Sequence, residues 1–207
     1  RNLEGQACVE LVELGENRGF GAGVNAGVRA LGPDYDGLVL VVNPDMRAEP
    51  GAVALLAGAV TAGVLDIACP AVYSGSAGQR AIYFTGGSLD RARVEADHWD
   101  YGLPFIRELG VVACGYIAGA SFLLARATWE RLGGFPEELF LYWEDAALSF
   151  RAGELGLRAG EFVVQWRGVG CLQRRAGQEA HCQFEVVVRL AHDPVAVRGY
   201  GQQILRF

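Results

Sequence analysis

The chain has 207 residues, 51% of them hydrophobic, with a formal net charge of −6 and a pI near 5.1. A chain of this length can bury one sizeable core, and because no stretch resembles a long linker, we expect a single domain over residues 1–207. The acidic balance lacks the basic stripe that a phosphate backbone requires, which argues against nucleic acid as a partner.

Strands and helices alternate in the first part of the chain. The expected order is a strand at 9–14, a helix at 22–31, a strand at 37–42, a helix at 50–62 and a strand at 66–72. This alternation predicts an α/β fold with a mostly parallel sheet flanked by helices. The most apolar run, residues 52–72, is broken by Asp66 and Pro70, so we interpret it as helix and strand and not as a membrane span.

The pattern changes at residue 73. Clusters of Gly, Ser and Thr with short aromatic runs predict a hairpin or active-site loops up to about residue 109. His98, Trp99 and Tyr101 lie in this segment and could stack on a sugar, although such a cluster more often covers a core. Further along, we expect a strand that enters a helix over 114–126, a helix up to Leu155 and a strand at 161–164.

Cysteine usage bears on the compartment. The five cysteines are odd in number and lack paired metal-ligand spacing: Cys8, Cys69, Cys114, Cys171 and Cys182. They therefore indicate reduced thiols in a cytoplasmic protein, with a role as small buried hydrophobes. The C-terminal stretch contains His181, His192, Arg174 and Arg175 without a shared ligand spacing, so we assign it no catalytic role.

A glycine-rich segment, ENRGFGAGVNAGVRAL at 16–31, precedes the second expected strand. Gly19, Gly21 and Gly23 would let the backbone approach a ligand before the helix begins, with its amides directed at a phosphate or ribose. Asn25 would then face the nucleotide. The same segment also fits a dinucleotide fingerprint of an NAD(P)-binding oxidoreductase, because Gly21, Gly23 and Ala26 follow the strand expected at 9–14.

Acidic residues in two segments of the chain are candidates for catalysis or metal binding. Asp45 ends an apolar run, so a buried strand would deliver its carboxylate to the ligand-binding edge of the sheet. Glu144 and Asp145 directly follow Tyr142 and Trp143, and a carboxylate held against aromatic rings has a raised pKa and becomes a better general base. The alternative is that these two acids simply open a helix.

Four stretches in order resemble family 2 glycosyltransferases, inverting enzymes of the GT-A fold, and especially their rhamnosyltransferase-like members. They are ENRGFGAGVNAGVRAL (16–31), GLVLVVNPD (37–45), GYIAGASFLLARATWERLGGF (115–135) and GGFPEELFLYWEDAAL (133–148). The resemblance covers about residues 9–165. It implies a nucleotide-sugar half at 1–72, an acceptor half at 73–165 and a divergent C-terminal segment at 166–207.

The resemblance also implies roles for individual residues. Asp145 would be the catalytic base, with Glu144 orienting it or contacting the acceptor. Asp45 would hold a divalent cation, Mg²⁺ or Mn²⁺, on the donor diphosphate. The implied donor-binding residues are Asn17, Gly19, Gly21, Gly23, Asn25, Asn43 and Asp45, and the implied acceptor-binding residues are Gly119, Ala120 and Trp143. The partners would be a nucleotide-diphosphate sugar and a carbohydrate or lipid-linked acceptor at the cytoplasmic face of a membrane, in cell-surface polysaccharide synthesis.

The chain departs from the family in four places. The strand and Asp-Asn segment with which the family opens do not precede Arg1, so a sheet edge would stay unpaired unless another segment fills it. Pro136 and Ala147 stand where the family has Asp, and Gln165 or Trp166 stands where it often has a metal-binding His. These departures bring metal dependence into question and keep open a catalytically idle domain that binds a nucleotide sugar or a partner.

Overall fold

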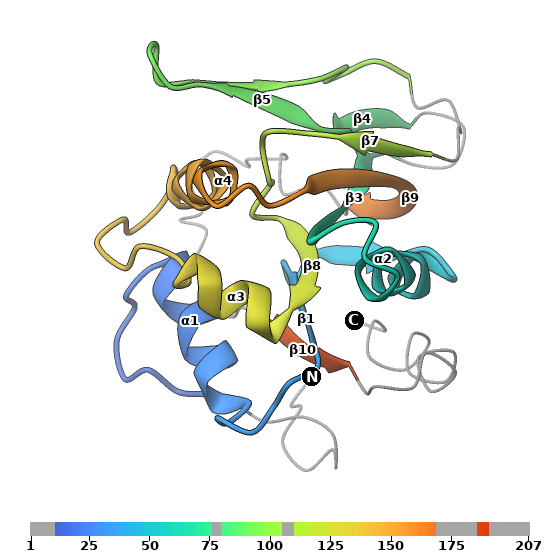
Figure 1. Cartoon of the computed structure of the whole chain (residues 1–207). Coiled ribbons are helices and arrows are strands. Elements are labelled where there is room, and N and C mark those ends of the chain that lie inside the picture. The colour runs from blue at the N-terminus through green and yellow to red at the C-terminus, as the bar shows by residue number, and fades with distance from the viewer. Residues whose placement is uncertain (1–10, 76–79, 105–109, 169–185, 191–207) are drawn as a thin grey trace.

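The computed structural model describes residues 11–75, 80–104, 110–168 and 186–190. Its helices are α1 (Phe20–Ala30), α2 (Ala52–Thr61), α3 (Arg126–Leu132) and α4 (Glu144–Glu154). The strands are β1 (Leu38–Val42), β2 (Met46–Ala48), β3 (Ile67–Ser74), β4 (Ala81–Phe84), β5 (Gly87–Asp90), β6 (Glu95–His98), β7 (Val111–Ala113), β8 (Ser121–Ala125), β9 (Ala159–Gly168) and β10 (Val186–Leu190). The α/β class and the helix-flanked sheet are confirmed (Figure 1).

The main sheet has the order β10-β1-β8-β3-β9-β2, with β4 added beside β3 and β7 beside β9. The prediction of a mostly parallel sheet is wrong, because only the β3–β9 pair is parallel and every other described pair is antiparallel. The reason is the insertion of β8. Strands β1 and β3 point the same way and are joined through α2, but the later strand β8 pairs antiparallel with both.

The second edge of β1 is also paired. Strand β10 runs antiparallel to it, with Leu38 opposite Leu190 and Val42 opposite Val186. The sequence predicts an open sheet edge unless another segment covers it, and β10 is that segment. No pattern in the sequence indicates this strand at 186–190.

The strand expected at 9–14 is wrong where it can be checked. Residues 11–14 adopt no strand, and Leu11, Val12 and Leu14 are exposed. Alternation of apolar and acidic residues satisfied the period of a strand, but these residues pair with no described strand. The hairpin expected within 73–109 is confirmed as β5 and β6, whereas the three-residue strands β2 and β7 were missed because they are too short to show a period. Cys8, Cys171, Cys182, Arg174, Arg175, His181 and His192 lie outside the described residues.

The core forms around the central strands. Val39, Ile67 and Phe122 are fully buried in β1, β3 and β8. These strands are covered on both faces, which explains why their sequences are almost continuously apolar. Helix α2 lies on one side of these strands, and α1, α3 and α4 lie together on the other (Figure 1). On that second side Trp129 and Phe122 stack with ring centroids 6.4 Å apart. This arrangement fixes the starts of α1 and α4 next to the same end of β8.

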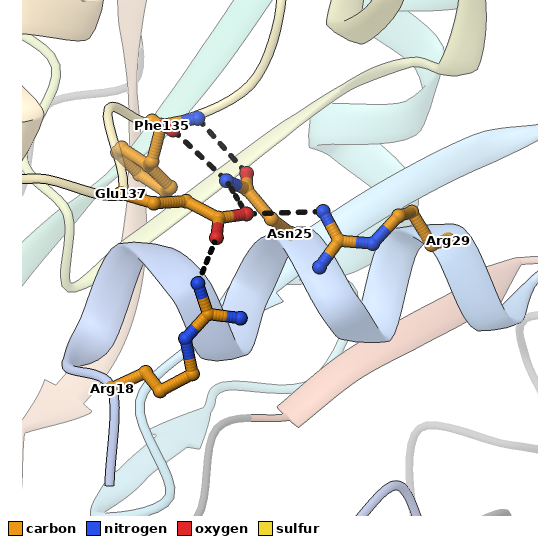
Figure 2. Close-up of polar contacts among 5 residues, drawn as sticks. All are labelled: Arg18, Asn25, Arg29, Phe135 and Glu137. Atoms are coloured by element: carbon orange, nitrogen blue, oxygen red, sulfur yellow. Dashed lines mark hydrogen bonds and ion pairs between the residues drawn. The ribbon is translucent and has the colours of Figure 1, made fainter. Parts of the chain in front are cut away.

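Asn25 joins α1 to the turn after α3 through its amide group (Figure 2). Its Nδ2 donates to the Phe135 carbonyl at 2.9 Å, and its Oδ1 accepts from the Phe135 amide at 2.9 Å. Gly134 lets the turn come this close, because it has φ +77° and an added Cβ would lie 2.6 Å from Asn25 Oδ1. We call these contacts the Asn25 clamp. They satisfy a buried backbone donor and acceptor that would otherwise be unpaired.

Glu137 extends the clamp at its solvent side. Its Oε1 accepts from Asn25 Nδ2 and Arg29 Nη1, each at 3.0 Å, and its Oε2 pairs with Arg18 at 3.0 Å (Figure 2). The Asn25 hydrogen bond, followed by the Arg29 pairing, lowers the pKa of Glu137. These outer ion pairs are exposed, so they contribute less than the buried bonds to Phe135.

Asn25→Ala should therefore destabilise the fold strongly, because it leaves the Phe135 N–H and C=O without partners. We expect the free energy of unfolding to fall by about 2–4 kcal/mol, measured by urea denaturation. The matched control is Arg29→Ala on the same helix, which removes only an exposed ion pair and should cost less than about 1 kcal/mol. Equal losses in the two variants would contradict a dominant role for the buried bonds.

Candidate active site

Four segments meet at the carboxyl end of β1. The Asn43 amide donates to the Ala120 carbonyl at 2.9 Å, which joins the end of β1 to the start of β8. One residue earlier, the Gly119 amide donates to Asp145 Oδ2 at 3.3 Å, which adds the start of α4. The ring of Phe20, in the first turn of α1, lies 3.5 Å from where a Cβ on Gly119 would be. Residues far apart in the sequence thus form one site.

Asp145 is half-buried and held by three described hydrogen bonds. Tyr116 Oη donates to its Oδ2 at 2.8 Å, alongside the Gly119 amide, and the Ala146 amide donates to its Oδ1 at 2.8 Å. A carboxylate has about four acceptor positions, so roughly one remains for a hydroxyl group from outside. The side chain is therefore oriented but not saturated, as a general base requires.

Ser149 fixes the turn of α4 that carries Asp145. Its hydroxyl donates to the Asp145 carbonyl at 2.6 Å and accepts from the Ile117 amide at 2.8 Å. This one side chain ties the helix to the segment that contains Tyr116 and Gly119. No motif indicates Ser149, because a serine inside a helix carries no functional pattern of its own.

Tyr116 supplies the aromatic contact that the sequence assigned to other residues. Tyr142 and Trp143 are exposed, at 67% and 44%, whereas the buried ring of Tyr116 reaches Asp145 directly. Burial, followed by the negative charge of Asp145, raises the pKa of the Tyr116 phenol, so the phenol stays protonated and acts as a donor. Tyr116 also packs against His98 at a ring-centroid distance of 5.3 Å. No motif in the sequence indicates a role for Tyr116.

Glu144 precedes Asp145 and is buried, with 7% of its surface exposed. Its Oε2 makes no hydrogen bond with any described residue, and Ser121 Oγ is another buried polar atom in that condition. Burial raises the pKa of Glu144, and the charge of Asp145 adds to this effect. This unpaired oxygen is covered by the surrounding protein, so its burial is a cost in stability that needs an explanation.

The glycine-rich segment is placed differently from the expectation. Gly19, at φ 90°, packs on the loop before α4, where an added Cβ would lie 2.1 Å from the Phe140 carbonyl oxygen. Gly21 packs on Phe135, and the Gly23 amide already makes the first bond of α1, to Gly19 O at 3.2 Å. Asn17 Oδ1 accepts from the Gly19 amide at 3.0 Å. These residues fasten α1 to the Phe135–Trp143 segment.

Asn25 is likewise engaged in the clamp and does not open toward Asp145. The dinucleotide interpretation is not supported, because the required strand is absent at 11–14 and the glycines at 21 and 23 lie within α1. A hollow of about 520 Å³ borders α1 and α3 near Arg29 and Arg126, but Asp145 does not line it. Since Arg126 donates to the Val28 carbonyl and Glu130, and Arg29 binds Glu137, this hollow offers few unengaged groups.

Comparisons with known proteins agree with this geometry. No family model matches the chain. The chain is 31% identical, over 167 aligned residues, to the N-acetylglucosaminyl-diphospho-decaprenol L-rhamnosyltransferase of Mycobacterium tuberculosis, in the CDC 1551 / Oshkosh and ATCC 25618 / H37Rv strains. The alignment covers 72% of this chain and 54% of each relative, so the chain spans about half the length of the curated relatives it matches.

The fold comparison points the same way. A crystal structure of GalNAc-T7 with UDP, GalNAc and Mn²⁺ superposes with a TM-score of 0.59 at 11% sequence identity, over 74% of this chain and 31% of that one. The chain has the GT-A fold. The fold and the rhamnosyltransferase similarity support each other, because the aligned relative and the superposed structure are independent comparisons.

Asn43 and Asp45 are the described residues at the end of β1 whose side chains fit a divalent cation. Both are half-buried at the end of β1, and neither side chain makes a hydrogen bond or ion pair with another described residue. No group of three or more His, Cys, Asp or Glu side chains gathers among the described residues. This sparse set suits Mg²⁺, which takes one or two carboxylates and completes its shell with substrate phosphates and water.

Two further findings bear on the departures from the family. Ala147 is half-buried on α4, and Pro136 precedes Glu137 of the clamp. Positions 165 and 166 lie in β9, whose backbone pairs with β2 and β3, but the Gln165 and Trp166 side chains are outside the description.

Among the described residues, no helix is both long and apolar enough to cross a membrane.

The raised pKa of Glu144 gives a prediction for stability. Between the ordinary Glu pKa of 4.5 and the higher folded value, the folded state binds more protons than the unfolded state, so stability falls as pH rises through that window. Glu144→Gln removes this penalty. We expect the variant to be more stable than the wild type at pH 7, with the difference shrinking below about pH 4.5, by thermal unfolding at several pH values. A gain that is constant with pH would show that ionisation is not its cause.

Proposed function

We propose that this chain carries the catalytic half of an inverting family 2 glycosyltransferase, with Asp145 as the base. The observation that carries the proposal is the arrangement of the Asp145 carboxylate, oriented by Tyr116 and Gly119 with an acceptor position left open. Gly119 packs against the carboxylate, where an added Cβ would lie 3.4 Å from Asp145 Cβ. Because Oδ2 already accepts from Tyr116 and Gly119, a sugar hydroxyl would donate to the open position on Oδ1.

The reaction proceeds by one displacement. Asp145 takes the proton of the acceptor hydroxyl as its oxygen attacks the anomeric carbon of the donor sugar. The new carbon–oxygen bond forms on the face opposite the diphosphate, and the bond to the diphosphate oxygen breaks with its electron pair leaving on the nucleotide diphosphate. Attack from the opposite face inverts the anomeric configuration. Glu144, which is buried directly before Asp145, would orient the base.

Asn43 and Asp45 would hold the donor side. A divalent cation bound there supplies Lewis-acid stabilisation of the charge that develops on the leaving diphosphate. The superposed GalNAc-T7 structure, which contains UDP and Mn²⁺, supports a cation of this kind. The residues of this chain contribute one carboxylate and one amide, placed by the β1–β8 connection at Asn43 and Ala120.

The substrate class follows from the relatives. Their name describes the transfer of L-rhamnose to N-acetylglucosaminyl-diphospho-decaprenol. By similarity, we infer a nucleotide-activated hexose or deoxyhexose as donor and a lipid-linked saccharide as acceptor, in cell-surface glycoconjugate synthesis at the cytoplasmic face of the membrane. An idle domain that only binds the nucleotide sugar is the second candidate, favoured by Ala147 and Pro136 at family Asp positions.

Donor binding is the first test. We expect one class among UDP-, dTDP- and GDP-sugars to bind in calorimetry, more tightly with Mg²⁺ or Mn²⁺ than without. Asp45→Asn should remove most of the metal-dependent gain, at least about tenfold in Kd. Asp34→Asn, an exposed acid before the other end of β1, is the matched control and should bind like the wild type. Absence of binding by every nucleotide sugar would overturn the donor site.

Asp145→Asn separates the enzyme from the idle domain. The amide keeps the size of the side chain but is not a base, so we expect sugar transfer to fall by a factor of about 10²–10⁴ while donor affinity is unchanged. Transfer is measured with radiolabelled donor and a lipid-linked acceptor, with Asp34→Asn again as control. Equal transfer by Asp145→Asn would remove Asp145 from the mechanism, and donor binding without transfer by the wild type would favour the idle domain.

A further inference from the structure

Four consecutive large apolar side chains are exposed directly before the candidate base. Phe140, Leu141, Tyr142 and Trp143 expose 55%, 54%, 67% and 44% of their surfaces. Elsewhere among the described residues, exposed large hydrophobics occur singly or in adjacent pairs. An exposed apolar cluster of this kind on a folded chain marks a contact surface. We call residues 140–143 the apolar loop.

The exposure of the apolar loop is built into the backbone. The Phe140 carbonyl accepts from the Phe20 amide at 3.3 Å, and Gly19 packs against the same carbonyl. Tyr142 and Trp143 both have φ 69°, a left-handed conformation that bulky residues rarely adopt. Strain of this kind persists only where the surroundings enforce it, and it gathers at functional sites. The loop is thus held outward.

The composition of the apolar loop identifies its partner as a lipid surface. Trp and Tyr favour the interface between head groups and acyl chains, and Phe and Leu favour the apolar layer below. The loop has no charge, and its flanking residues are acidic: Glu137, Glu138, Glu144 and Asp145. Attraction to anionic lipid therefore contributes little, so the contact is apolar and independent of salt.

We propose that residues 140–143 insert into the interfacial layer of a lipid bilayer and so hold Asp145 at the head group of a lipid-linked acceptor. The acceptor part rests on the proposed function. Asp145 is two residues from Trp143 and five from Phe140. Even a fully extended chain would place it at most about 7 Å from Trp143 and about 18 Å from Phe140. With an insertion of about 5–10 Å, the base stays within reach of a diphosphate-linked sugar at the membrane surface.

The test is partitioning of the 207-residue chain onto uncharged phosphatidylcholine vesicles, measured by co-sedimentation. We expect the wild type to bind equally at about 0.1 M and about 1 M salt, where the Debye length falls from about 10 Å to about 3 Å. The double variant Phe140→Ser/Leu141→Ser should lose at least about tenfold in partition coefficient. Both side chains are exposed, so its thermal unfolding should match that of the wild type.

The matched control is Leu55→Ser/Val64→Ser, which removes two equally exposed apolar side chains, at 46% and 50%, in and after α2. Helix α2 lies across the molecule from the segment between α3 and α4 that contains the apolar loop (Figure 1). This control should bind vesicles like the wild type. No vesicle binding by the wild type, binding that disappears at high salt, or equal binding by the loop variant would overturn the proposal.

A second readout places the loop in the bilayer. Brominated lipid should quench the fluorescence of Trp143, and Trp143→Phe should remove the quenched component; unchanged quenching in that variant would contradict insertion at this loop. Vesicle binding needs no nucleotide sugar, and donor binding needs no vesicle. Donor binding without vesicle binding would therefore refute only the membrane contact, whereas vesicle binding without donor binding would refute only the proposed function.

Discussion

The Asn25 amide group is the contact on which the geometry of the site depends. It pairs with both backbone polar groups of Phe135, and so sets the distance between α1 and the segment that runs into α4. From that fixed point the chain continues past Phe140, which rests on Gly19 and Phe20, to Asp145. A residue expected to bind nucleotide thus holds two parts of the scaffold together, and the candidate base Asp145 is positioned as a consequence.

The central strands supply the other half of the arrangement. Because β8 pairs with β1 in the interior of the sheet, Asn43 at the end of one strand meets Ala120 at the start of the other. Residues expected on the donor side and on the acceptor side are joined there by a backbone hydrogen bond. Asp45, which is half-buried and has no described partner, lies two residues beyond this junction, where a ligand could reach its carboxylate.

Local patterns predicted the longer elements, and motif order predicted the fold. Helices α1, α2 and α4 and strands β1 and β3 lie within a few residues of their expected positions because their apolar periods are strong. Strand directions were missed, since pairing between β1, β8 and β10 depends on contacts far apart in the sequence. Motifs predicted Asp145, Gly119, Ala120 and Asn43, which the structure brings together. No motif indicated Tyr116, because its contact with Asp145 forms only when distant segments meet.

The tight packing around Phe135 has a consequence for how this sequence can vary. Asn25 contacts only the backbone of Phe135, so the clamp does not itself select the side chain at position 135. Gly21 does not select it either, because an added Cβ there would lie 2.8 Å from Phe135 Cβ, an atom that every residue except glycine carries. Gly134 is fixed by Asn25 Oδ1 and by its backbone angle together. Among related chains, position 21 should therefore stay glycine whichever side chain stands at 135, and 134 should stay glycine wherever Asn25 is kept.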